Sequence, residues 1–260
     1  MYKIWLNYIN LRKIFKVIAL VCFCLWSNAY SLENSDNERD KNMKIAIITA
    51  MQSEFDAVHS LYQFRGDNQE ATAIAHGKEI LLMKSGIGKV NGALTTQKAI
   101  EKGADLVINT GLAGGIDDSL TQGDIVLAQK VSYHDVDCGG DNAKGQVQDF
   151  PLYYMASPLV EKLHQQLPEY HYGVTVTGDQ FVTDANHLLA IKQDFPEALA
   201  VDMESAAVAQ TCYLAKIPYI SLRIISDVVG KENQEEQYNN FWQTVPHKAA
   251  EMVDNVLKHI

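Results

Sequence analysis

Proline, cysteine and arginine are all scarce in this sequence. Its 260 residues include 6 Pro, 4 Cys and 16 Gly, while 47% are hydrophobic and 21% are charged. This composition excludes collagen-like, low-complexity and mainly disordered proteins. A chain of this length buries on the order of 70% of its unfolded surface when it folds, so its core needs no disulfide framework. The net charge of −10 argues against a nucleic-acid partner or an anionic membrane surface, because both require clustered cations.

The first 29 residues differ from the rest in charge. They hold four Lys and Arg and no carboxylate, and an apolar run over 17–26 is followed by Ser27, Asn28 and Ala29. This pattern of a basic flank, a short apolar run and small residues is typical of a secretory signal peptide. The alternative is a membrane anchor, but the run is too short to span a ~30 Å hydrocarbon core. We therefore predict that 1–29 is cleaved and that the mature protein is exported, periplasmic or secreted, with no membrane contact.

Removal of this segment changes the composition of what remains. The formal charge falls from −10 to −14, and the cysteines left are Cys138 and Cys212. Export permits a disulfide. Cys212 lies in an apolar helical pattern and Cys138 in a glycine-rich loop, however, so two free thiols are the favoured interpretation. Residues 30–42 are polar and without periodicity, and we predict a flexible leader there.

From residue 43 onward, short apolar runs alternate with segments of helical period. That alternation is typical of an α/β sheet with helices on its faces, and it predicts one domain over 43–260. The predicted strands are 44–49, 80–84, 106–109, 125–131, 174–177, 199–201 and 219–225. The predicted helices include 92–102, 186–194, 203–215 and 238–258.

Polar and glycine-rich residues follow these strands closely. Glu54 comes after 44–49, Glu204 after 199–201 and Asp227 after 219–225, while glycine-rich turns at 85–89 and 110–115 follow two further strands. Ligands of open α/β sheets bind beyond the carboxyl ends of the strands. We therefore expect the three carboxylates to lie at one site.

Common cofactor and metal motifs do not match by spacing. Asn91 stands where a dinucleotide fingerprint has its third glycine, and Met83 where a P-loop has its first. The 8 His show no HExxH spacing, and no Gly-x-Ser-x-Gly elbow occurs. We predict no cofactor and no metal. The segment 133–137, with His134, is interpreted as a hydrogen-bonded structural turn rather than a ligand cluster.

Seven segments taken in order resemble one family. They are MKIAIITAMQSEF, KSGIGKVNGA, VINTGLAGG, GDIVLAQKVSYHDVD, TGDQFV, AVDMESAAVAQ and RIISDV. In this order they are similar to the bacterial 5′-methylthioadenosine/S-adenosylhomocysteine nucleosidases of the nucleoside phosphorylase superfamily, and the match covers roughly residues 43 to 260. The resemblance implies a twisted mixed β-sheet flanked by helices, a homodimer, and hydrolysis of the N-glycosidic bond of 5′-thio-substituted adenosines to adenine and a thioribose.

The resemblance also implies roles for single residues. Glu54 would orient and activate water, Asp227 would deliver a proton to adenine N7, and Glu204 would hold the ribose hydroxyls. The further residues implied at the substrate are Met203 beside the sugar, Phe181 stacked on the purine, Val182 with backbone hydrogen bonds to the adenine edge, Arg223 supporting the water and Glu54, Tyr238 closing the 5′ pocket, and Met51, Ser85 and Ser226 in the same motifs.

The chemistry independently requires such a set. Cleavage of an N-glycosidic bond passes through an oxocarbenium-like state, so the leaving base must be protonated while a nucleophile waits on the opposite face. Two carboxyl groups in different protonation states meet that need: Asp227 must be protonated near neutral pH, and Glu54 must be ionised.

Two other functions stay open on these residues. A nucleoside phosphorylase would replace water by phosphate, which arginines typically bind, and the mature chain has only Arg39, Arg65 and Arg223. A non-catalytic exported nucleoside-binding protein would need no poised acid. Both arguments favour the hydrolase.

Departures from the family pattern concern the substrate. Leu112 stands where the family usually has a small residue, Asp202 replaces a more usual glutamate, and 139–144 lacks the family's frequent aromatics. Tyr238 stands about where a phenylalanine is usual. The preference among methylthioadenosine, S-adenosylhomocysteine, 5′-deoxyadenosine and futalosine-type nucleosides is therefore open.

Overall fold

The computed structural model describes residues 43–231, 233–244 and 246–260. The predicted signal peptide (1–29) and leader (30–42) lie outside the described residues, so both stay predictions. Among the residues described, no helix is both long and apolar enough to cross a bilayer.

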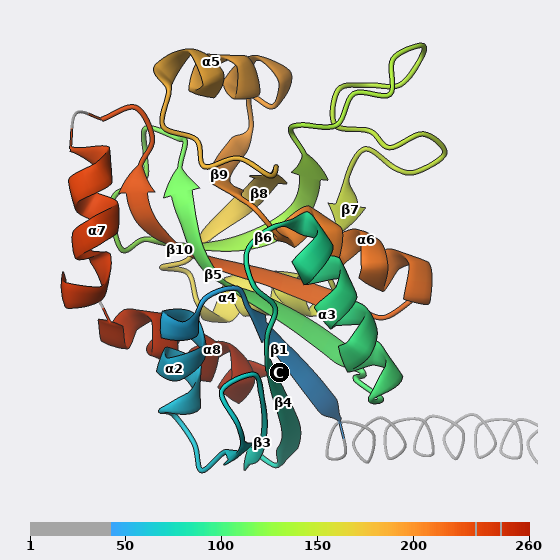
Figure 1. The fold of residues 1–260 in the computed structure, drawn as a ribbon, viewed down its shortest axis with the longest axis vertical. Helices are drawn as coiled ribbons and strands as arrows, with labels where there is room; N and C mark the ends of the chain where they lie inside the picture. The colour runs from blue at the N-terminus through green and yellow to red at the C-terminus, as the bar shows by residue number, and fades with distance from the viewer. Residues whose placement is uncertain (1–42, 232, 245) are drawn as a thin grey trace, which may run out of the picture. The chain divides into compact units, whose positions relative to one another are not determined.

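One mixed β-sheet runs through the molecule (Figure 1). Its strands follow the order β10-β6-β8-β9-β5-β1-β4-β3-β2, and β10 also pairs with β5, so that β10, β6, β8, β9 and β5 form a closed ring. β1, β4, β5 and β10 pair in parallel, while β6 is antiparallel to β10 and β9 is antiparallel to β5. The strands are β1 (Lys44–Thr49), β2 (Arg65–Gly66), β3 (Glu70–Ala75), β4 (Lys78–Lys84), β5 (Leu106–Gly115), β6 (Ile125–Tyr133), β7 (Tyr154–Met155), β8 (His171–Thr177), β9 (Ala198–Asp202) and β10 (Tyr219–Val228).

Helices cover the sheet from both sides. They are α2 (Gln52–His59), α3 (Lys89–Glu101), α4 (Leu159–Gln166), α5 (Ala185–Asp194), α6 (Ser205–Ala215), α7 (Gln234–Thr244) and α8 (Pro246–His259). Alternate residues of β1 show the two layers, because side chains alternate across a strand. Ile45 and Ile47 pack with α2, α4 and α8, whereas Ala46 and Ile48 pack with α3 and α6. The predicted mixed sheet flanked by helices is confirmed.

Several predicted bounds are wrong in an informative way. The glycine-rich segment 110–115 is no turn but the second half of β5. It stays extended because its glycines let other groups approach closely: a Cβ on Gly111 would lie 2.6 Å from Glu54 Oε1 and 2.6 Å from Arg223 Nη1, and one on Gly114 would lie 2.8 Å from Val229.

The predicted helix 238–258 is also wrong as a single element. It is divided into α7 and α8, and Pro246 is the first residue of α8, a position where proline's missing N–H costs no hydrogen bond. α6 begins at Ser205 rather than at 203, with Glu204 as its N-cap. The short strands β2, β3 and β7 and the eight-residue helices α2 and α4 were not predicted.

Candidate active site

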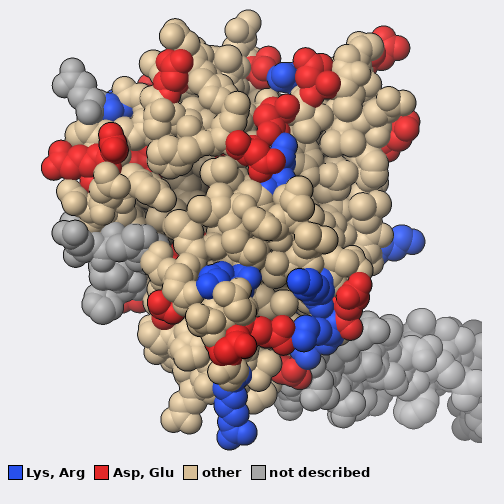
Figure 2. Space-filling view, in the orientation of Figure 1, with Lys and Arg blue, Asp and Glu red and all other residues tan. Residues whose placement is uncertain are grey.

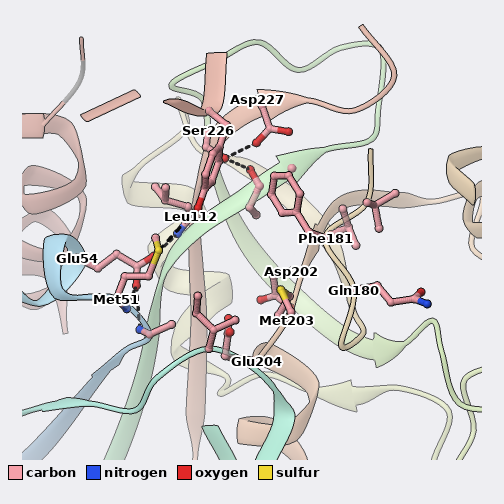
Figure 3. Close-up of a pocket in the computed structure, with 17 residues that line it drawn as sticks. Met51, Glu54, Leu112, Gln180, Phe181, Asp202, Met203, Glu204, Ser226 and Asp227 are labelled. Carbon is pink, nitrogen blue, oxygen red and sulfur yellow. Dashed lines mark hydrogen bonds between the residues drawn. The ribbon is translucent and has the colours of Figure 1, made fainter. Parts of the chain in front are cut away.

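One pocket lies at the carboxyl ends of the strands (Figure 3). Its walls come from the turn after β1, from α2, from the second half of β5, from the loop after β8, from the turn between β9 and α6, from the end of β10 and from α7. Its lining residues are Ala50, Met51, Glu54, Ile87, Leu112, Ala113, Gly114, Gln180, Phe181, Val182, Val201, Asp202, Met203, Glu204, Ser226, Asp227 and Tyr238.

Nine of the eleven residues predicted at the site line this pocket: Met51, Glu54, Phe181, Val182, Met203, Glu204, Ser226, Asp227 and Tyr238. The other two do not. The Ser85 hydroxyl is turned to the backbone, where the carbonyl oxygens of Thr49 and Gly86 lie 3.1 Å and 2.7 Å away. Arg223 is 1% exposed and lies behind the pocket wall.

Glu54 is held by backbone N–H groups. Its Oε2 accepts hydrogen bonds from the N–H groups of Ala50 (2.8 Å) and Met51 (2.9 Å), and its Oε1 accepts one from Leu112 (2.9 Å). Burial raises the pKa of this carboxyl, while the three N–H donors and the charge of Arg223 oppose the rise. Three donors fix the orientation of the group, and donors of this kind stabilise its ionised form.

Asp227 lies apart from Glu54 in the pocket, at the end of β10 (Figure 3). Ser226 Oγ donates to its Oδ1 (2.5 Å), and Gln234 Nε2 donates to its Oδ2 (2.7 Å). Burial raises the pKa of Asp227, and these two uncharged donors oppose the rise without cancelling it. The carboxyl is therefore set up to hold a proton at higher pH than an exposed aspartate.

Glu204 belongs to a buried charge network. Its Oε1 accepts a hydrogen bond from the N–H of Gly88 (2.8 Å), and its Oε2 lies 3.7 Å from Arg223 Nη2. Arg223 also pairs with Asp202 (Nε to Oδ2, 2.7 Å) and donates to Asn109 and Ser205. Burial raises the pKa of Glu204 to about 7, against the lowering effect of the Arg223 charge.

Aromatic and sulfur side chains form the remaining wall. Phe181 and Tyr238 meet edge to face with ring centroids 5.0 Å apart, and the Tyr238 hydroxyl lies 3.8 Å from Met51 Sδ. Phe181 is 53% exposed, so one face of its ring is free to stack on a planar ligand. A flat base could lie between these side chains and the strand ends.

Several residues that shape the site were not predicted. Leu112 contributes a backbone N–H, and the residue type gives no sign of that role. Asn109 and Gln234 are buried polar residues that hold Arg223 and Asp227. In sequence, Gln234 looks no different from Gln237 three residues later, and only the packing of α7 on β10 separates the two.

The segment 133–137 is only in part the hydrogen-bonded structural turn that the sequence predicts. Asp135 accepts hydrogen bonds from Lys89 Nζ (2.6 Å) and from the N–H of Asp179 (3.0 Å). His134 Nε2, however, has no hydrogen-bond partner, and burial lowers the pKa of this ring to about 4. Within the described ranges, no group of three or more His, Cys, Asp or Glu side chains could hold a metal ion. Cys138 is exposed and Cys212 buried, and both are free thiols.

Comparison with known proteins agrees with this geometry. The family model described as "Phosphorylase superfamily" matches residues 44–258. A 5′-methylthioadenosine/S-adenosylhomocysteine nucleosidase of Bacillus pumilus is 38% identical over 236 residues, which are 84% of this chain and 98% of that protein. The crystal structure of an S-adenosylhomocysteine nucleosidase from Streptococcus pyogenes, in complex with 5-methylthiotubericidin, is 32% identical with a TM-score of 0.79, and 84% of this chain covers 98% of it.

A third relative is similar to the same degree. The structure of the nucleosidase from S. pneumoniae with the transition-state inhibitor MT-ImmA is 33% identical with a TM-score of 0.78, and 84% of this chain covers 99% of it. The fold and the strand-end carboxylates thus define a member of the phosphorylase superfamily. Within that superfamily, the chain belongs to the 5′-methylthioadenosine/S-adenosylhomocysteine nucleosidases, which confirms the family predicted from the sequence.

Proposed function

We propose that the protein hydrolyses the N-glycosidic bond of 5′-thio-substituted adenosines, releasing adenine and the thioribose. The observation that carries the proposal is that Glu54, Glu204 and Asp227 line one pocket from three different elements, each in a different environment. The substrate is methylthioadenosine or S-adenosylhomocysteine. Asp227 serves as the acid, Glu54 as the base, and Glu204 as the group that holds the ribose.

Asp227 acts on the leaving base. As the bond to the sugar breaks, electron density moves onto adenine, and a proton from Asp227 to N7 neutralises it. Burial raises the pKa of Asp227 above that of an exposed aspartate, which favours the protonated form that this step requires. The Ser226 hydroxyl can accept from the protonated carboxyl, because the Ala113 carbonyl oxygen lies 3.3 Å from Ser226 Oγ and can take the hydroxyl hydrogen. The acid form is thus compatible with its neighbours.

Glu54 acts on the water. Two N–H donors occupy Oε2 and one occupies Oε1, which leaves acceptor capacity on Oε1 for a water proton. A buried carboxylate with a raised pKa is a better proton acceptor than an exposed one, while the N–H donors favour its ionised form. The two carboxyls thus differ in their surroundings: three backbone N–H donors and the charge of Arg223 favour the ionised form of Glu54, whereas Asp227 receives two uncharged side-chain donors.

Glu204 binds the sugar hydroxyls as an anion and favours the cationic character of the sugar in the transition state. Its pKa of about 7 makes this interaction sensitive to pH. Above pH 7 the carboxylate is ionised, and below pH 7 it becomes neutral. We therefore expect the KM for methylthioadenosine to rise up to about tenfold between pH 8 and pH 6, as one pH unit below the pKa leaves about a tenth of the group ionised.

Initial rates at pH 6 to 8 measure this dependence. Glu204→Gln should have a raised KM at pH 8 and a flatter KM profile, because no charge is left to titrate. A variant that kept the wild-type pH dependence of KM would assign the dependence to another group. Glu101→Gln, an exposed change on α3, is the matched control and should leave the profile unchanged.

Water rather than phosphate is the nucleophile. Arg223 makes hydrogen bonds and ion pairs with Asp202, Asn109 and Ser205 behind the pocket wall, so its guanidinium is engaged. Arg65, the other arginine of the described chain, is exposed in β2. Neither is in place to grip a phosphate in the pocket.

The proposal is tested by incubating the mature protein with methylthioadenosine in phosphate-free buffer. We expect adenine and methylthioribose as products, at a rate that added phosphate leaves unchanged. Activity that appears only with phosphate, together with a ribose 1-phosphate product, would identify a phosphorylase. Tight binding without turnover in either buffer would identify a nucleoside-binding protein.

We also propose that the protein forms a homodimer. Val90 and Leu94 on α3 are 68% and 57% exposed, and Ile87 in the loop before α3 is 51% exposed. Tyr213 and Leu214 extend this apolar stripe on the adjoining α6. In Figure 2 the surface over the middle of α3 and over α6 carries few charged side chains. Such a face is typical of a protein interface. Because Ile87 also lines the pocket, a second copy seated there would border the substrate.

Sedimentation velocity tests the dimer. The wild type should sediment at twice the mass of one chain, and the double variant Val90→Asp, Leu94→Asp at the mass of one chain, with a raised KM. Ile74→Asp is the matched control, because Ile74 is 73% exposed on β3 and is not part of the stripe on α3 and α6. A monomeric wild type with full activity would contradict the proposal.

Export is the remaining part of the proposal. The basic, apolar and small-residue pattern over 1–29 supports it. N-terminal sequencing of the protein purified from its native cells should begin at Tyr30. A chain that still began at Met1 in the soluble cell fraction would rule out cleavage and export.

A further inference from the structure

Gln234 is a buried polar residue that the mechanism above does not use. It is the first residue of α7, it is 5% exposed, and it does not line the pocket. Its side chain instead lies behind two pocket residues, Asp227 and Val182. A buried amide is costly unless its hydrogen-bonding groups are satisfied, so its partners indicate its purpose.

The partners of Gln234 fix the orientation of its amide. The N–H of Gly230 donates to Oε1 (3.0 Å), so the oxygen must point toward the turn after β10. Nε2 then faces the pocket wall and donates to the Val182 carbonyl oxygen (2.9 Å) and to Asp227 Oδ2 (2.7 Å). An NH₂ group has two hydrogens, and both are used.

We propose that Gln234 is a positioning residue for the acid: its amide joins the Asp227 carboxyl to the Val182 carbonyl and so fixes the proton donor against the backbone that receives the adenine edge. The proposal rests on the proposed function, in which Asp227 and Val182 meet the same base. Gln234 ties together the end of β10, the loop after β8 and the start of α7.

The amide also restricts where the acid proton can lie. Because Nε2 only donates, the proton of Asp227 cannot point toward Gln234. It must lie toward the pocket or toward Ser226, whose hydroxyl can both accept and donate. After the proton has moved to adenine, the same amide stabilises the carboxylate that remains. Gln234 therefore makes Asp227 a stronger acid than burial alone would leave it.

Other titratable groups near Asp227 affect different parts of a pH profile. Glu54 from α2 and Glu204 at the start of α6 share the pocket and act as anions, so their protonation reduces activity on the acid side. Tyr238 from α7 has a pKa raised above its ordinary value by burial and by the charges of these carboxyls, so it ionises only at high pH. Loss of activity on the alkaline side up to that range reports the deprotonation of Asp227.

The test compares the kcat/KM profiles of Gln234→Met and Gln237→Met. Loss of the donor to Asp227 raises the pKa of the acid, so the alkaline limb of Gln234→Met should move to higher pH by about one unit, with kcat lowered about tenfold at pH 7. Gln237 lies on the same helix and its Oε1 accepts from the N–H of Val228, so Gln237→Met makes the same chemical change without touching Asp227. The alkaline limb of the kcat/KM profile of Gln237→Met should coincide with that of the wild type.

Gln234→Glu keeps the test decisive if the methionine variant does not fold. It preserves the shape of the side chain and the acceptor for the Gly230 N–H. Its ionised carboxylate, however, repels the carboxylate of Asp227, so the alkaline limb of the kcat/KM profile should move to higher pH than in Gln234→Met. Alkaline limbs that match the wild type in both variants would overturn the proposal. Failure of the proposed function is a separate result: Asp227→Asn would then keep its activity, whatever the Gln234 variants do.

Discussion

Asp227→Asn is expected to lower kcat for methylthioadenosine by about 10²- to 10⁴-fold, the usual contribution of one proton transfer, and to change KM little. An asparagine can keep both neighbours: its oxygen can accept from Gln234, and its NH₂ can donate to Ser226, whose hydrogen then goes to Ala113. It cannot give a proton to adenine. The pocket should therefore bind substrate and fail to release the base.

Two measurements separate this explanation from general damage. With a 4-nitrophenyl methylthioriboside, whose leaving group departs without protonation, Asp227→Asn should turn over at near the wild-type rate. Asp118→Asn, an exposed aspartate, is the matched control and should leave both substrates unaffected. Near wild-type hydrolysis of methylthioadenosine by Asp227→Asn would show that the acid is another group.

The sequence predicted the sheet and most of the site because local patterns specify them. Apolar runs such as 44–49 and 219–225 become central strands buried on both faces, and such strands need no alternation to be recognised. Glu54, Glu204 and Asp227 were found by their place just after these runs. The parallel strands β1 and β10 bring the carboxyl ends that precede Glu54 and Asp227 to one edge of the sheet. β9 is antiparallel to β5 but pairs with its last two residues, so Glu204 meets the other two carboxylates there.

What escaped prediction depends on long-range packing. The segment 110–115 reads locally as a turn, yet it is a strand, because its glycines make room for Glu54 and Arg223 from other elements. Ser85 follows a strand as the binding residues do, but its hydroxyl satisfies nearby carbonyls. β10 closes the ring of strands by pairing with both β5 and β6. The local sequence pattern likewise does not predict this pairing.

Glu54→Gln is expected to lower kcat by about 10²- to 10⁴-fold for methylthioadenosine, with the KM less affected. The amide cannot take the proton of the attacking water. It also fits its surroundings poorly, because its NH₂ must face at least one of the N–H donors of Ala50, Met51 and Leu112. One unsatisfied donor costs about 1–3 kcal/mol, which the removal of a buried charge offsets in part. The variant should therefore remain folded, as a thermal unfolding measurement can verify.

The nitrophenyl substrate gives Glu54→Gln the opposite signature from Asp227→Asn. Its leaving group needs no acid, but water must still attack the sugar, so Glu54→Gln should lose activity on both substrates. Leu112 provides a further comparison: Leu112→Ala keeps the backbone N–H that Oε1 accepts and should keep most of the rate. If Glu54→Gln retained the wild-type kcat on either substrate, the three N–H donors would be holding a structural carboxylate, and the base would have to be sought elsewhere in the pocket.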